Sequence, residues 1–82
     1  NRESGLGRFD IQLMPLVNGI PGFIFEFKHT SDAHVDLGSL AEKALQQIDE
    51  KKYDTELRDA GIDSIVKIGI AFQGKNAVVR RA

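Results

Sequence analysis

The chain has 82 residues, of which 41% are hydrophobic and 28% charged, and its net charge is -1. This length and charge balance indicate one small globular domain and exclude a strongly basic nucleic-acid binder whose affinity comes from many phosphate contacts. The absence of cysteine excludes a disulfide scaffold and a thiolate zinc site, and no apolar run approaches the roughly 20 residues that span a bilayer. A carboxylate metal site remains compatible with this charge, because a bound ion offsets the charge of its ligands.

Two strands are predicted in the first 29 residues. The segment 8–14 alternates apolar and polar residues, which is typical of a half-buried strand. Asn18-Gly19 lies between apolar residues and predicts a hairpin turn. The segment 22–29 predicts the second strand, and its phenylalanines share one face because side chains alternate along a strand. We expect this face to belong to the core: Phe23, Phe25 and Phe27.

The middle of the chain predicts helices. Ser39 and Glu42 match a capping box, so the main helix is expected over about 40–52. Its apolar residues recur at helical spacing: Leu40, Ala41, Ala44, Leu45 and Ile48. A short second helix is expected over 55–60, and Gly61 is a suitable left-handed C-cap for it.

The last third of the chain predicts two more strands, over 64–72 and 77–81, joined by a turn at 73–76. The first of them is apolar almost throughout, which is typical of a central strand covered on both faces. The order of elements predicts the α/β class and a mixed four-stranded sheet, with a right-handed helical crossover between parallel second and third strands. One helix covers one face, so we expect other residues or a partner chain to cover the second.

Asp10, Glu26 and Lys28 carry the strongest chemical signal. Glu26 and Lys28 are two residues apart, so they share a face of their strand. Strict pairing about the turn at 18–19 places Asp10 opposite Phe27, on the other face. Asp10 shares a face with Glu26 and Lys28 only if a bulge or a bend shifts the register by one residue. The strand pattern leaves both registers open.

Two carboxylates and a lysine suit the hydrolysis of phosphodiesters. Carboxylate oxygens are hard ligands for Mg²⁺, which polarises the phosphoryl group and lowers the pKa of bound water. A nearby ammonium group orients the attacking water and stabilises negative charge in the transition state. The alternative is an ordinary solvated ion pair between Glu26 and Lys28, which these two residues alone would favour.

The pattern of these residues resembles the PD-(D/E)XK nuclease superfamily. The segment Gly7-Arg8-Phe9-Asp10-Ile11 is similar to its Gly-x-x-Asp-apolar element, especially in the RecB-like branch, and Glu26-Phe27-Lys28 is similar to its (D/E)XK element. Gln47 with Tyr53 resembles the Gln and Tyr element of that branch, at a longer spacing than the usual Gln-x-x-x-Tyr. The stretch 7–72 is also similar to nuclease-like domains at the C-terminal end of bacterial proteins that carry an ATPase-like module.

The resemblance implies a restriction-endonuclease-like core whose site uses Mg²⁺ or Mn²⁺. Asp10 and Glu26 would be metal ligands, together with the backbone carbonyl of Phe27. Lys28 would position the nucleophilic water, and Gln47 would support the site from the helix. The resemblance also favours the shifted register, since the family needs Asp10 beside Glu26.

Partners and context follow from the same resemblance. Arg8 and His29 are candidate nucleic-acid contacts, because basic side chains near the site can reach phosphates. DNA is the implied substrate, an ATPase-like domain of the same full-length protein is an implied partner, and a cytoplasmic location is expected. The family's helix before the first motif strand is absent from residues 1–82, so we expect a truncated domain of a larger protein, with a homodimer as one way of completing it.

Two functions from other classes remain open. One is a non-catalytic interaction domain that keeps the nuclease-like fold, and the other is a small α/β dimerisation module whose acidic face is only solvated. Convergence of the side-chain ends of Asp10, Glu26 and Lys28 within reach of one metal ion would favour the nuclease, and their separation onto opposite sheet faces would favour the other two functions. A zinc site at His29 and His34 is not expected, because they are five residues apart and loop histidines are usually solvated.

Overall fold

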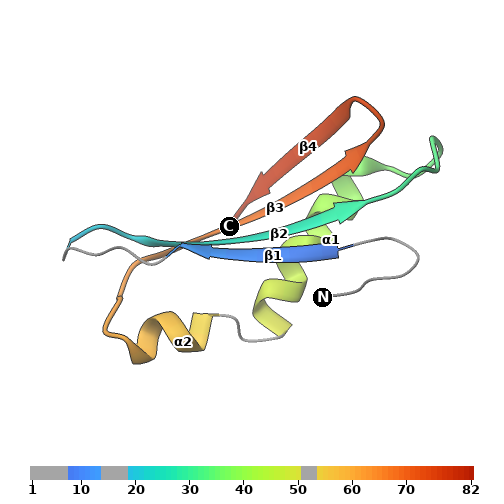
Figure 1. The fold of residues 1–82 in the computed structure, drawn as a ribbon. Helices are drawn as coiled ribbons and strands as arrows, with labels where there is room; N and C mark the ends of the chain where they lie inside the picture. Colours follow the sequence, from blue (N-terminus) through green and yellow to red (C-terminus); the bar gives the residue numbers. More distant parts are fainter. Residues whose placement is uncertain (1–7, 14–18, 51–53) are drawn as a thin grey trace.

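The computed structural model describes residues 8–13, 19–50 and 54–82, and for residues 8–10, 12 and 54 it describes the backbone alone. Figure 1 shows the six elements in chain order. They are β1 (Arg8–Leu13), β2 (Gly22–His29), α1 (Leu37–Glu50), α2 (Asp54–Asp59), β3 (Ile65–Gln73) and β4 (Asn76–Arg81). The mixed α/β class predicted from the sequence is confirmed. Neither helix is long and apolar enough to cross a membrane, among the residues that the structure describes.

The four strands form one sheet in the order β1-β2-β3-β4. β1 and β2 are antiparallel, β2 and β3 are parallel, and β3 and β4 are antiparallel. The chain passes through α1 and α2 between the two parallel strands, and both helices lie on the same side of the sheet (Figure 1). The parallel pair β2 and β3 therefore forms the centre of the sheet, and the motif residues of β2 lie there.

The core lies between the helices and one sheet face. α1 packs against β2, β3 and β4. One cluster of buried side chains joins β2 to both helices: Ile24, Leu45, Ile48 and Leu57. A second cluster lies nearer the start of α1: Leu40, Ala41 and Ala71. All five apolar positions predicted for the buried stripe of the main helix are buried, so the helical periodicity identified its inner face correctly.

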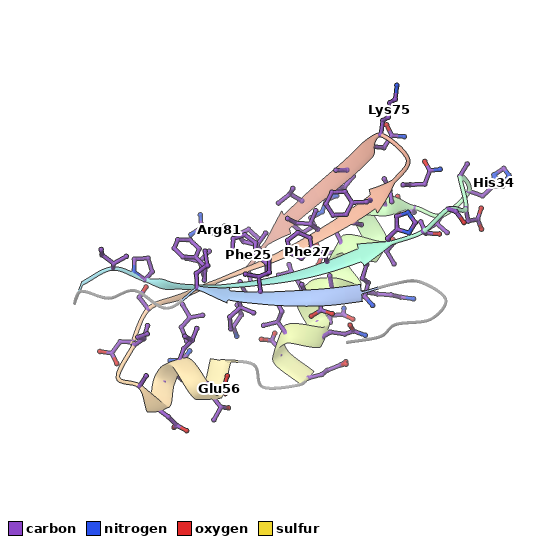
Figure 2. All side chains as sticks on the ribbon, in the orientation of Figure 1. Phe25, Phe27, His34, Glu56, Lys75 and Arg81 are labelled. Carbon is purple, nitrogen blue, oxygen red and sulfur yellow. The ribbon has the colours of Figure 1, made fainter. Side chains whose placement is uncertain are left out.

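The phenylalanine face of β2 is not the face that the helices cover, and this prediction was wrong. Phe23, Phe25 and Phe27 are half-buried, whereas the alternate residues of β2 from Ile24 to Lys28 are buried. Figure 2 shows Phe25 and Phe27 on the side of the sheet away from α1. The phenylalanine rings instead cover part of one another's surface by stacking. Neighbouring ring centroids along β2 lie 6.2 and 6.1 Å apart, and Phe72 of β3 stacks on Phe27 at 6.0 Å.

The uncovered face extends across all four strands. Ile11 and Leu13 of β1 are 43% and 51% exposed, and Val79 of β4 is 55% exposed. Ile68 and Ile70 of β3 share this face through their pairing with Phe25 and Phe27 and are half-buried. The apolar strand predicted to be covered on both faces is thus covered on one, within the described residues.

α1 begins three residues earlier than predicted, because Asp36 caps it. The Asp36 carboxylate accepts hydrogen bonds from the Ser39 backbone N–H at 3.3 Å and from the Ser39 hydroxyl at 2.7 Å. These bonds lower the pKa of Asp36 below its ordinary value. The capping box predicted at Ser39 and Glu42 is wrong, since Ser39 lies inside the helix. The predicted helix end near Lys52 lies outside the described residues.

The predicted C-cap at Gly61 is confirmed. Gly61 has a φ of +89°, in the left-handed region that a residue without a side chain adopts most easily. Its N–H donates to the Arg58 carbonyl at 2.9 Å, and the Ile62 N–H donates to the Leu57 carbonyl at 3.0 Å. This pair of bonds is a Schellman motif, which ends α2 and directs the chain into β3.

Gly69 lets α1 approach the sheet at the level of the motif residues. It pairs with Glu26 in the parallel ladder and lies under α1. A Cβ atom at this position would lie 2.9 Å from the Leu45 nitrogen and 3.1 Å from the Ala44 Cβ, and it would clash with the Ala41 carbonyl oxygen. Because those contacts are mostly helix backbone, no side-chain rotation relieves them, and only glycine fits without moving α1.

We expect Gly69→Ala to lower the free energy of unfolding by about 1–3 kcal/mol, because the added methyl group overpacks the helix–sheet contact. Chemical denaturation measures this change. Gly61→Ala is the matched control, because its added methyl group meets no heavy atom within 4 Å and only the left-handed backbone is strained, at a cost of about 1 kcal/mol. A Gly69→Ala variant as stable as the parent protein would show that α1 is not held at this distance.

We expect Asp36→Ala to destabilise the protein at neutral pH and to matter less in acid. The folded state lowers the pKa of Asp36, so its contribution is present above the unfolded pKa and is lost as the pH falls through the folded value. Denaturation midpoints of both proteins at pH 6 and pH 3 test this, with Asp32→Asn as a loop control. A difference between the two proteins that stays constant with pH would contradict it.

Candidate functional site

The ladder between β1 and β2 places Asp10 opposite Glu26. Residues that oppose each other in an antiparallel ladder lie on the same face of the sheet. The strict hairpin register, with Asp10 opposite Phe27, is therefore wrong, and the register shifted by one residue is present. The connection includes Gly19, whose φ is +88°, while Asn18 of the predicted turn lies outside the described residues.

The same register places Arg8 opposite Lys28. Positions 8, 10, 26 and 28 thus form two pairs, separated by the pair of Phe9 and Phe27, on the face that α1 covers. Only the backbone of β1 is described at positions 8 and 10. The ladder alone brings the two predicted carboxylate positions together on β1 and β2.

Glu26 and Lys28 are buried charged residues. The Glu26 side chain is 0% exposed and the Lys28 side chain is 5% exposed. Charged side chains are almost never buried to this extent unless they have partners, and each of these two takes part in an interaction within the chain. An ordinary solvated ion pair on a strand surface is therefore excluded for Glu26 and Lys28.

Two salt bridges join one flank of α1 to β3 and β4. Glu42 pairs with Arg80 of β4 at 3.6 Å, and Asp49 pairs with Lys67 of β3 at 2.6 Å. Both acidic residues lie on one flank of the helix, because they are seven residues, or about two turns, apart. Gln47 lies on the other flank of α1, across the buried stripe from Glu42 and Asp49. This flank faces the side of the sheet formed by β1 and β2.

Gln47 has a buried amide oxygen. Its Oε1 is inaccessible to solvent and has no hydrogen-bond partner among the described residues. Gln47 also lines a shallow cavity of about 200 Å³ together with Lys43, Gln46 and Glu50. A buried oxygen without a partner is costly, so this amide is a candidate for binding a group from outside the described residues.

The remaining predicted residues lie at different places. His29 is exposed at the end of β2, directly after Lys28. The ring of Phe27 lies on the uncovered face (Figure 2), so only its backbone carbonyl could serve the site. Tyr53 lies outside the described residues. His34 is exposed in the loop before α1, where its backbone N–H donates to the Asp32 carboxylate at 2.9 Å. It belongs to no group of metal-binding side chains in the described part of the chain.

The donor set fits a hard divalent cation. Carboxylates at positions 10 and 26 and a backbone carbonyl at position 27 are oxygen ligands of the kind that Mg²⁺ and Mn²⁺ prefer. A carboxylate that is fully buried on the covered face, as Glu26 is, gains more from a nearby cation than a solvated one would. No group of three metal-binding side chains occurs within the described side chains, which do not include that of Asp10.

The sequence analysis did not identify the cavity residues Lys43, Gln46 and Glu50. The sequence does contain a pattern that groups them, because Gln46, Gln47 and Glu50 follow Lys43 by three, four and seven residues, on one face of α1. Such a polar stripe is also what any solvated helix face shows. Only the buried amide oxygen of Gln47 distinguishes this polar stripe from an ordinary solvated face.

We expect Gln47→Leu to raise the free energy of unfolding by about 1 kcal/mol in metal-free buffer, because it removes a buried oxygen without a partner. Gln46→Leu is the matched control on the exposed side of α1 and is expected to change stability by less than about 0.5 kcal/mol. Chemical denaturation measures both values. A loss of stability in Gln47→Leu would mean that the amide has a structural partner.

Comparison with known proteins gives one match. The family model described as PD-(D/E)XK nuclease superfamily matches residues 1–82. Neither the curated proteins nor the solved structures give a significant match to the chain.

Proposed function

The chain belongs to the PD-(D/E)XK nuclease superfamily, and from this premise we propose that it hydrolyses phosphodiester bonds of DNA with Mg²⁺ or Mn²⁺. The observation that carries the proposal is the register of β1 and β2. It sets Asp10 opposite Glu26, two residues along β2 from the buried Lys28, on the face covered by α1. This is the arrangement of two carboxylate positions and a lysine that the family's motifs require.

Asp10, Glu26 and the Phe27 carbonyl would hold the metal ion. When bound, the ion supplies Lewis-acid activation of the phosphoryl group and lowers the pKa of water. The burial of Glu26 serves this role, because a carboxylate kept out of water retains little competing solvation.

Lys28 would orient the attacking water. Its ammonium group is 5% exposed, so its charge acts in a medium of lower effective dielectric constant than water. In the hydrolysis, the water oxygen adds to phosphorus while the bond from phosphorus to the leaving oxygen breaks. One proton leaves the water, and one proton is taken up by the leaving oxygen. Gln47 would hold the water or the phosphate through its side-chain amide.

Arg8 and His29 would contact the nucleic-acid backbone. Arg8 opposes Lys28 in the ladder, and His29 follows Lys28 at the exposed end of β2. Both positions thus lie at the end of the sheet that carries the site, where phosphates on either side of the cleaved bond would pass. An ATPase-like domain of the same protein would be the natural companion, as the resemblance implies, and the proposed setting is the cytoplasm.

A non-catalytic interaction domain is the second candidate function, and a specific observation favours it. The uncovered sheet face presents a stacked row of aromatic rings beside aliphatic residues of β1 and β4. Contiguous exposed apolar surface of this kind commonly marks an interaction site. The two functions can also coexist, because the aromatic rings and the motif carboxylates lie on opposite faces.

Metal binding and cleavage test the first candidate. We expect calorimetry to show Mn²⁺ binding to the parent chain and none to Asp10→Asn or Glu26→Gln. Lys28→Met should keep metal binding and lose about 10²-fold or more of the DNA cleavage rate, because it removes a charge that acts only on the reacting groups. Glu42→Gln, an exposed acidic residue on the other flank of α1, is the matched control and should change neither measurement.

The outcomes separate the two candidates. Metal binding that persists in Glu26→Gln would exclude Glu26 as a ligand. A parent chain that binds no metal and cleaves no DNA would favour the interaction domain, and thermal unfolding of each variant would show whether a loss comes from misfolding.

A further inference from the structure

We propose that Lys43 binds a phosphate group of the nucleic-acid substrate in the cavity beside Gln47. This inference rests on the proposed nuclease function and adds a substrate subsite on α1. The subsite is separate from the residues proposed to bind metal, since those lie on β1 and β2.

The cavity has the size and chemistry for one phosphate group. Its volume is about 200 Å³, and all four residues that line it are polar or charged and lie on α1. The amides of Gln46 and Gln47 can donate hydrogen bonds, and the Lys43 ammonium supplies the positive charge that an anion requires. Phosphate contacts of this kind, from Lys and Gln side chains, fix the position of a nucleic acid without reading its sequence.

Lys43 has a charge available for a ligand. It is exposed and forms no salt bridge within the described residues. Two other cations near α1 are already engaged, since Lys67 pairs with Asp49 and Arg80 pairs with Glu42. A cation without a carboxylate partner loses less when it binds phosphate, because no existing ion pair must be broken.

The position of the cavity links it to the candidate site. Lys43 precedes Gln47 by four residues, so the two side chains are neighbours on the helix surface. Gln47 lies at the boundary between the cavity and the covered sheet face, with its Oε1 buried and without a partner among the described residues. A phosphate bound at Lys43 would therefore adjoin the flank of α1 that faces β2.

Glu50 makes one end of the cavity unfavourable for an anion. It lies seven residues after Lys43, which corresponds to about 10 Å along the helix axis. The cavity thus has a cationic end and an anionic end, and a phosphate is directed toward Lys43. Such an arrangement favours phosphate binding at one end of the cavity over the other.

Salt dependence of DNA binding tests the proposal. Binding of a duplex is measured with Ca²⁺ in place of Mg²⁺, over a series of salt concentrations. We expect Lys43→Ala to lower the slope of log K against log salt by about 0.9, the value for one lost phosphate contact, and to weaken binding about tenfold, as expected for a charge-assisted bond. Lys43→Arg should restore both, and Glu50→Gln should strengthen binding.

Lys75 provides the matched control, since it is exposed at the tip of the turn between β3 and β4, away from α1 (Figure 2). Lys75→Ala should leave the slope unchanged, and Mn²⁺ binding by Lys43→Ala should equal that of the parent chain. An unchanged slope in Lys43→Ala, or an equal loss in Lys75→Ala, would overturn the subsite while leaving the metal site intact. A parent chain that binds neither Mn²⁺ nor DNA would overturn both proposals.

Discussion

The burial of Glu26 and Lys28 beneath α1 is the constraint on which the rest of this structure depends. Two charged side chains in the centre of a sheet are expensive to desolvate, and small proteins have little stability to spare. The helix that covers them begins at the Asp36 cap, and its buried apolar stripe packs against the sheet. The apolar clusters on either side of the charged pair then stabilise a site that would not be stable alone.

Local pattern predicted the elements well, because hydrophobic periodicity and turn residues act over a few positions. The buried stripe of α1 and the C-cap at Gly61 follow directly from this. The buried face of β2 could not be predicted in this way, since Phe23, Phe25 and Phe27 are large apolar residues and yet lie on the face away from the helices. Stacking between rings substitutes for a covering layer, and the helices instead meet the small residues Gly69 and Ala71.

The site was predictable only through the family resemblance. Asp10 and Glu26 are 16 residues apart, and their register differs by one residue from the one that a two-residue turn at Asn18-Gly19 would give. A shift by one residue reverses the face of every side chain, so strand periodicity could not decide between the two registers. The cap at Asp36 was missed for a related reason, since Ser39 carries the same capping signal three residues later.

Gly69 has a consequence for how this protein can diverge in sequence. Its missing side chain sets the separation between α1 and β3 at the rung of Glu26, and hence the depth at which Gln47 sits over the neighbouring strands. A larger residue there can be accommodated only by lifting the helix or by shortening its inner face, which is already alanine at positions 41 and 44. A bulkier residue at this position would therefore hold Gln47 farther from the paired positions 10 and 26, so a residue outside the candidate site sets the distance between the helix and the strands that form it.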